Sequence, residues 1–181
     1  MDLIVRAVDV GSGNTKFVTS VVTSPSGADI RCVSFPSVAY PSSDGLPSWP
    51  SGDRRKTTFI PIGALFYEVG PEVALAADTF RAKQLHDEYT ESPEYMALLR
   101  GALSMMKVPH IDLLVVGLPV ALLALKKAAL EKAMTGKHDV GDGKTVTVAK
   151  ALAVAQPQGA LVHYASVYQK MAEIGKEQSL I

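Results

Sequence analysis

The sequence predicts an α/β domain in which a mixed five-stranded sheet is flanked by helices and interrupted by a small inserted subdomain. Three observations lead to this prediction. Three short strand-like segments open the chain, a Pro-, Ser- and Gly-rich stretch follows, and helical and strand periods then alternate. Strands joined by tight turns lie antiparallel, and strands joined through helices lie parallel, so we expect both directions in one sheet.

The first three segments predict an antiparallel meander. Leu3 to Val10 is nearly continuous apolar sequence, which is typical of a strand buried on both faces. Thr15 to Thr23 is rich in Val and Thr, and Ile30 to Phe35 forms the third strand. Cys32, on that third strand, is expected to be a small buried apolar residue.

Residues 36–89 are predicted to form the inserted subdomain. Proline, serine and glycine dominate from Pro36 to about Pro61, and Phe66 to Val69 is a short strand that ends at Gly70. Residues 1–35 and 90–177 then form the core of one domain that occupies the whole chain, 1–181.

After the insert, the order helix-strand-helix-strand-helix is expected. Ser92 is a suitable N-cap with Pro93 in the first helical position, and Pro109 ends this helix. Ile111 to Val116 is a buried strand. The second helix follows Gly117-Leu118-Pro119 and is expected to bury one apolar face, made of Leu122, Leu125, Ala129 and Ala133.

Gly136 is placed to cap that second helix. A hairpin about Gly141-Asp142-Gly143 leads into a strand over roughly Val146 to Ala155. A third helix runs to about Ile174.

Composition excludes several classes of protein. The 18 basic and 18 acidic side chains of the 181 residues cancel, which gives no support for direct nucleic-acid binding. Cys32 is alone, there is no basic-then-apolar leader, and no run of about twenty apolar residues exists. We therefore expect a cytoplasmic protein with no membrane partner. The four histidines have no ligand spacing, so no metal site is expected from His86, His110, His138 and His163.

The most informative segment runs from Asp9 to Lys16 between the first two strands. Glycines at alternate positions let backbone N–H groups approach an anion closely, and Ser12 adds a hydroxyl donor. Lys16 can lean back over the turn. A carboxylate at Asp9 would repel a bare phosphate, but it suits a hydrated Mg²⁺ placed between them. The segment can therefore form a cradle for Mg²⁺ and a triphosphate.

The same segment also fits a simple hairpin with no ligand, because short glycine motifs often match by chance. It is not a Walker loop, because the spaced Gly-Lys pattern and the following helix are absent. It is not a dinucleotide fingerprint either, since a strand rather than a helix follows the glycines.

This run resembles the first phosphate motif of the superfamily of actins, heat-shock-protein ATPases and sugar kinases. Within it, the chain most resembles the bacterial actin-like proteins of plasmid segregation, the ParM/StbA group. The order and spacing of four further short runs agree with that group, namely Phe35-Pro36-Ser37, Tyr67-Glu68-Val69-Gly70, Gly117-Leu118-Pro119 and Gln156-Pro157-Gln158-Gly159. The resemblance covers nearly the whole chain and implies a ribonuclease H-like, actin-type domain.

The resemblance also implies roles for individual residues. Asp9 would hold Mg²⁺ through water. The phosphates of ATP would be bound by Gly11, Ser12, Gly13, Asn14 and Lys16. Gln158 would orient the attacking water, because a glutamine positions water without acting as a strong base. Partners would be other copies of the chain in a filament and an adaptor protein.

A second phosphate motif, the adenosine-binding glycines and the second domain do not occur in these 181 residues. One wall of an interdomain cleft offers about half the contacts, so we expect weak ATP binding and negligible hydrolysis by a fragment of this kind. Two alternatives to a filament-forming ATPase stay open: a small-molecule kinase of the same superfamily, and a non-catalytic assembly module.

Overall fold

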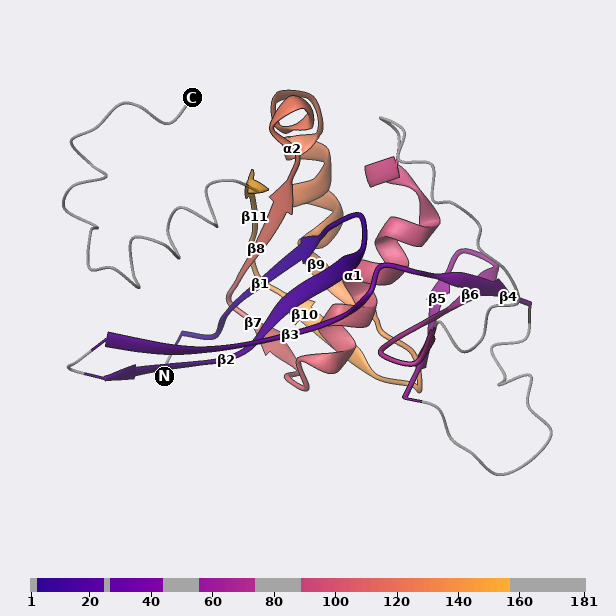
Figure 1. Cartoon of the computed structure of the whole chain (residues 1–181), viewed down its shortest axis with the longest axis horizontal. Coiled ribbons are helices and arrows are strands. Elements are labelled where there is room, and N and C mark those ends of the chain that lie inside the picture. Colours follow the sequence, from indigo (N-terminus) through magenta and orange to yellow (C-terminus); the bar gives the residue numbers. More distant parts are fainter. Residues whose placement is uncertain (1–2, 25–26, 44–55, 74–88, 157–181) are drawn as a thin grey trace.

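The computed structural model describes residues 3–24, 27–43, 56–73 and 89–156. The main sheet has five strands in the order β11-β8-β1-β2-β3 (Figure 1). At one side, β1 (Val5–Val10), β2 (Asn14–Ser24) and β3 (Gly27–Pro36) form the predicted antiparallel meander.

On the other side of β1, the main sheet is parallel. β8 (Leu113–Leu118) pairs with β1, and β11 (Ala151–Ala155) pairs with β8. The predicted mixed five-stranded sheet is therefore confirmed. The predicted third helix lies outside the described residues.

The insert contributes a small antiparallel sheet in the order β4-β6-β5. Its strands are β4 (Tyr40–Ser42), β5 (Thr58–Ile62) and β6 (Leu65–Val69). Helix α1 (Pro93–Met105) contacts both this sheet and the main sheet. The contact with β6 is close, because a Cβ on Gly101 would lie 2.5 Å from the Val69 side chain.

The start of α1 confirms the predicted cap. After a short 3-10 turn (η2, Tyr89–Glu91), Ser92 accepts a hydrogen bond from the Tyr95 N–H at 3.1 Å, and Pro93 is the first helical residue. The helix ends at Met105, earlier than Pro109 requires, because Lys107 turns the chain with a positive φ of 55°.

Two predicted strands are each divided between two sheets. The segment 110–118 contains β7 (His110–Ile111) before β8, and the segment 145–155 contains β10 (Thr145–Val148) before β11. β7 and β10 join β9 (Gly136–Asp139) in a separate sheet, ordered β7-β10-β9. The prediction of single strands over 111–116 and 146–155 is wrong in this respect, since a continuous apolar run does not reveal where the chain changes sheets.

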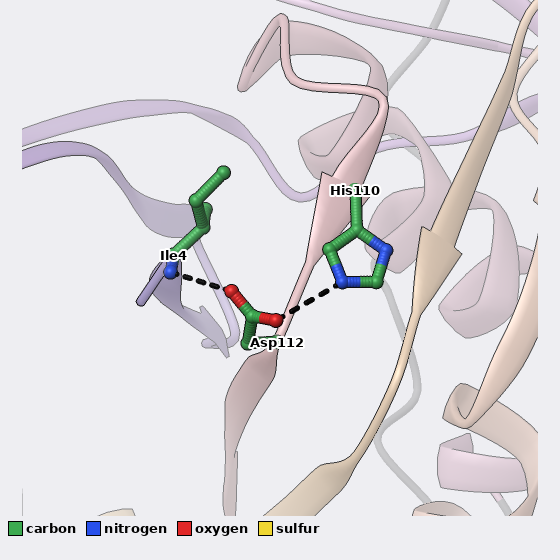
Figure 2. A network of polar contacts seen from close by, with 3 residues as sticks. All are labelled: Ile4, His110 and Asp112. Carbon is green, nitrogen blue, oxygen red and sulfur yellow. Dashed lines mark hydrogen bonds and ion pairs between the residues drawn. The ribbon is translucent and has the colours of Figure 1, made fainter. Parts of the chain in front are cut away.

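Asp112 occupies the first of these divisions (Figure 2). Its carboxylate accepts a hydrogen bond from the Ile4 N–H at 2.7 Å and lies 3.1 Å from the His110 ring nitrogen Nε2. These hydrogen bonds hold the pKa of Asp112 below its ordinary value. The side chain thus ties the start of β1 to the junction between β7 and β8.

Helix α2 (Val120–Met134) packs through a face other than the predicted one. Leu125 is 78% exposed, and Ala129 and Ala133 are exposed as well. Leu130 and Met134 are buried instead, and Leu123 packs against the core. The helix is apolar on most sides, so its sequence does not single out one face.

Cys32 is exposed, which contradicts the expectation of a buried thiol. It lies on β3, the outermost strand of the main sheet in the described residues. An edge strand leaves side chains accessible that a central strand would cover.

Neither α1 nor α2 has the length and hydrophobicity that a helix needs to cross a lipid bilayer. Among the described residues, no group of three or more His, Cys, Asp or Glu side chains is arranged to hold a metal ion.

His138 of β9 is a buried polar side chain in the β7-β10-β9 sheet. It is 2% exposed, its Nε2 lies 2.9 Å from the Met134 carbonyl, and its Nδ1 has no hydrogen-bond partner in the described part of the chain. Burial lowers the pKa of His138, and the nearby Arg100 lowers it further, against an opposing effect of the Met134 carbonyl. The imidazole is therefore neutral in the folded protein at neutral pH.

We expect folding stability to fall as the pH drops below about 6.5, the ordinary pKa of an unfolded histidine. Because the folded pKa lies lower, the unfolded chain binds more protons in this range, and the loss continues down to the folded pKa. Urea unfolding at about pH 7 and about pH 5 should show a smaller difference for His138→Gln than for the native chain. An identical pH dependence in both proteins would contradict the assignment.

Candidate functional site

The candidate site lies at the edge where three parallel strands end. Register pairs Asp9 of β1 with Gly117 of β8, and Gly117 with Val154 of β11. The glycine turn, the start of α2 and Gln156 follow these three strands and therefore meet at one edge. The carboxyl edge of a parallel sheet is the usual place for a ligand site in α/β domains.

The glycine turn is held from outside by Ser37. The Ser37 N–H donates to the Gly13 carbonyl at 2.9 Å, and the Ser37 hydroxyl lies 2.9 Å from the buried Thr15 hydroxyl. Inside the turn, the Gly11 N–H donates to the Asn14 carbonyl at 3.1 Å. The run Phe35-Pro36-Ser37, noted in the sequence, therefore has a structural role as the support of this turn.

The two glycines of the turn differ in what they allow. A Cβ on Gly11 would lie 3.1 Å from the Asn14 carbonyl oxygen, whereas a Cβ on Gly13 would meet nothing within 4 Å. Close packing thus favours glycine at Gly11, while Gly13 leaves its backbone open to solvent or to a ligand.

Asp9 is half-buried and is held by a residue far away in the chain. The Gln156 side-chain amide donates to Asp9 Oδ1 at 2.8 Å. A Cβ on Gly117 would lie 2.7 Å from the same oxygen and 3.1 Å from Gln156 Cγ. The absence of a side chain at Gly117 therefore makes room for the Asp9–Gln156 contact.

Lys16 is the cross-strand partner of Asp9, so the two side chains leave the sheet on the same face. Lys16 is exposed, and no ion pair joins it to Asp9 within the described residues. Its ammonium group is therefore available to a ligand bound over the turn.

A cavity of about 350 Å³ adjoins the turn. It is bounded by the end of β1, the segment before α1, the start of α2 and Gln156, and its lining residues are Val10, Gly11, Ser12, Tyr89, Thr90, Tyr95, Pro119, Ala121, Leu122 and Gln156. Of the six residues predicted to bind nucleotide, Gly11 and Ser12 line this cavity and Asp9 contacts its wall through Gln156. Gly13, Asn14 and Lys16 lie on the exposed side of the turn.

Two hydroxyl groups on the cavity wall have no hydrogen-bond partner among the residues that the structure describes. These are the hydroxyls of Thr90 and Tyr95, whose residues are 9% and 2% exposed. Burial raises the pKa of Tyr95, and the charge of Asp9 raises it further. The Tyr95 hydroxyl therefore stays protonated at neutral pH and can donate to a ligand or a water molecule.

The electrostatic field at the cavity has two opposed sources. Asp9 is negative, while α2 begins at the cavity with Pro119, without a side-chain cap and without an acid in its first turn. A helix start of this kind has free N–H groups and partial positive charge, which favours an anion. A carboxylate beside such a helix end suits an anionic ligand that carries a divalent cation, and the residues present therefore fit Mg²⁺ with a phosphate group.

Sequence reasoning missed Gln156 and the two hydroxyl-bearing residues. Gln158, the predicted water-orienting residue, lies outside the described residues. The signal for Gln156 was present, since it is the first residue after β11 and the first residue beyond a parallel strand lies at the ligand edge. The sequence does not indicate that Thr90 and Tyr95 belong to the site. The pattern of a helix start does not show that the helix borders a cavity.

Comparison with known families identifies the fold. Residues 7–159 match the family model for the N-terminal domain of actin-like proteins. The chain belongs to this family. A search of curated protein sequences finds no significant relative.

Solved structures of actin-like proteins share the family fold. Apo ParM of pSK41 superposes with a TM-score of 0.62 at 16% identity, over 89% of this chain and 52% of that protein. AlfA from the B. subtilis plasmid pLS32, solved as a filament, gives 0.59 at 19% identity, over 88% and 58%. The archaeal actin homolog Ta0583, solved in complex with ADP, gives 0.52 at 21% identity, over 90% and 47%.

The actin-like chain thus spans about half the length of these structural relatives. The family match and the superpositions confirm the actin-type fold expected from the glycine turn and the order of elements.

Proposed function

We propose that this chain is the nucleotide-binding N-terminal half of an actin-like ATPase. The parent protein would bind Mg-ATP in a cleft between two domains and polymerise in the cytoplasm. One observation carries the proposal: the Asp9–Gln156 pair beside the glycine turn, where three parallel strands end. The ADP complex of the archaeal relative supports a nucleotide as the ligand class.

In this proposal, each residue of the turn has its own role. Asp9 holds Mg²⁺ through water, and Gly11, Ser12, Gly13 and Asn14 wrap around the β- and γ-phosphates. The Gly11 N–H stays bonded to the Asn14 carbonyl and keeps the turn closed. Lys16 contacts the phosphates from the exposed side of the turn. The metal ion neutralises phosphate charge that Asp9 would otherwise repel.

Self-association is proposed as the cellular role, with the positioning of plasmid DNA as its use. The filament structure of AlfA and the fold shared with ParM support assembly, and an adaptor protein would make the link to DNA. The balanced charge of the chain suits that indirect link, since a surface that binds DNA directly carries a basic excess.

Calorimetric titration of Mg-ATP into this chain tests the proposal. We expect weak but measurable binding, because one wall of the cleft supplies about half of the contacts. Light scattering of a chain extended to the length of the relatives should rise on adding nucleotide. Growth beyond a dimer that ignores nucleotide would instead indicate a non-catalytic module, and phosphate transfer to a metabolite would indicate a kinase.

We also propose that a glutamine of the run Gln156-Pro157-Gln158 orients the attacking water. Sequence resemblance favours Gln158, whereas the contact with Asp9 favours Gln156. In an extended chain, Gln156→Ala should lower the hydrolysis rate by roughly a hundred-fold, with Mg-ATP affinity changed much less. Gln158→Ala, from the same run of sequence, is measured beside it. If only Gln158→Ala lowers the rate, the role belongs to Gln158.

A further inference from the structure

β3 forms an open edge of the main sheet. In the described part of the chain it pairs only with β2. Residues 29–34 are all exposed, on both faces of the strand. Figure 1 shows the β2–β3 hairpin extending well beyond the rest of the sheet. An edge strand of this length can add a further strand.

The backbone of β3 presents a regular row of hydrogen-bonding groups at this edge. The hydroxyl of Thr19, on β2, donates to the Arg31 carbonyl at 3.1 Å, so that carbonyl points toward β2. Carbonyl direction alternates along a strand, and the carbonyls of Ile30 and Cys32 therefore point outward. No described residue pairs with this outward row.

The residues before and after Ile30 carry opposite charges, and their side chains share one face of the strand. Asp29 and Arg31 are two residues apart and both are exposed. Neither forms an ion pair within the described residues. The side chain of Ile30, which lies between them on the opposite face, is 52% exposed.

We propose that two copies of this chain pair through β3, antiparallel, about a two-fold axis at Ile30. In this register Asp29 lies opposite Arg31 of the second copy, and the pair is repeated by symmetry. Ile30 packs against its own counterpart. The main sheets of the two copies then form one continuous sheet.

Neighbouring registers lack this complementarity. An axis at Arg31 would set the two arginines opposite each other, and an axis at Cys32 would set Arg31 opposite Val33. Since opposite charges stabilise a cross-strand pair and like charges destabilise it, the charge pattern selects the axis at Ile30. A second copy fits the edge because its own charges supply both complements.

This pairing involves neither the glycine turn nor the cavity. It therefore does not depend on nucleotide, and its test is separate from the test of the proposed function.

Crosslinking through a single cysteine tests the pairing in the 181-residue chain. Cys32 is the only cysteine, so Cys32→Ser provides a thiol-free background. In that background, Ile30→Cys should form a disulfide-linked dimer under mild oxidation without nucleotide, because paired strands bring the two sulfurs within bonding range. Val22→Cys is the matched control: it is 60% exposed but lies on β2, about 14 Å from its counterpart across two β3 strands.

Charge reversal then tests the register. In the Ile30→Cys, Cys32→Ser background, either Asp29→Arg or Arg31→Asp alone should lower the dimer yield roughly ten-fold. The double reversal, Asp29→Arg with Arg31→Asp, should restore it. Equal crosslinking at Ile30 and Val22, no dimer at Ile30, or no recovery in the double reversal would overturn the proposal, and circular dichroism confirms that each variant is folded.

Discussion

Asp9→Asn is expected to weaken Mg-ATP binding by roughly ten- to a hundred-fold, because a charged acceptor for the water shell of the metal is lost. The substitution keeps the size of the side chain and a hydrogen bond to Gln156. Without Mg²⁺ the sign should change, since Asp9 then faces the phosphates directly. ATP alone should bind Asp9→Asn at least as well as the native chain.

Asp142→Asn is the control for Asp9→Asn in the same titration. Asp142 has 72% of its side chain exposed, and it lies 3.9 Å from the Lys144 ammonium group. Its backbone has a positive φ of 54°, which asparagine adopts readily. Equal loss of affinity in both variants would show that charge alone, rather than a site at Asp9, governs binding. Unchanged Mg-ATP affinity in Asp9→Asn would indicate that the turn is a simple hairpin with no role in binding Mg-ATP.

Gly141→Ala is expected to have the largest effect on stability, roughly 3 kcal/mol or more. Gly141 has a positive φ of 83°, and a Cβ there would lie 2.2 Å from the Phe59 carbonyl oxygen on β5. Backbone cannot move aside as a flexible side chain can. The clash would separate the β9–β10 hairpin from the sheet of the insert.

Gly143→Ala separates the two causes. Gly143 also has a positive φ, 67°, but a Cβ there meets nothing within 4 Å. It should therefore cost only the conformational strain, about 1 kcal/mol. Urea unfolding measures both variants. If the two losses of stability are equal, the contact between Gly141 and Phe59 contributes nothing.

The sequence predicted the central features of this fold for physical reasons. Alternating glycines between two β-rich segments allowed few structures other than a tight turn, and Ser92-Pro93 is a strong start signal for a helix. Both are local signals, and both are confirmed. The main sheet followed from the order of elements and the rule for parallel connections.

The features that were missed depend on tertiary contacts. Leu125 matches the helical period as well as Leu123 does, and only packing shows which is buried. Gln156 belongs to the candidate site because it contacts Asp9, which is 147 residues away in the sequence. The division of a strand at Asp112 depends on its hydrogen bond to Ile4, which no local pattern contains.

That division at Asp112 has a consequence for how the domain unfolds. The chain passes twice from the β7-β10-β9 sheet to the main sheet, at Asp112 and at Lys150. At the second crossing, the Leu114 N–H donates to the Lys150 carbonyl at 2.9 Å. Loss of the hydrogen bonds in either sheet should therefore disrupt the other sheet as well. In hydrogen exchange, amides of β8, β10 and β11 should open together as one cooperative unit, while those of the protruding β2–β3 hairpin exchange earlier.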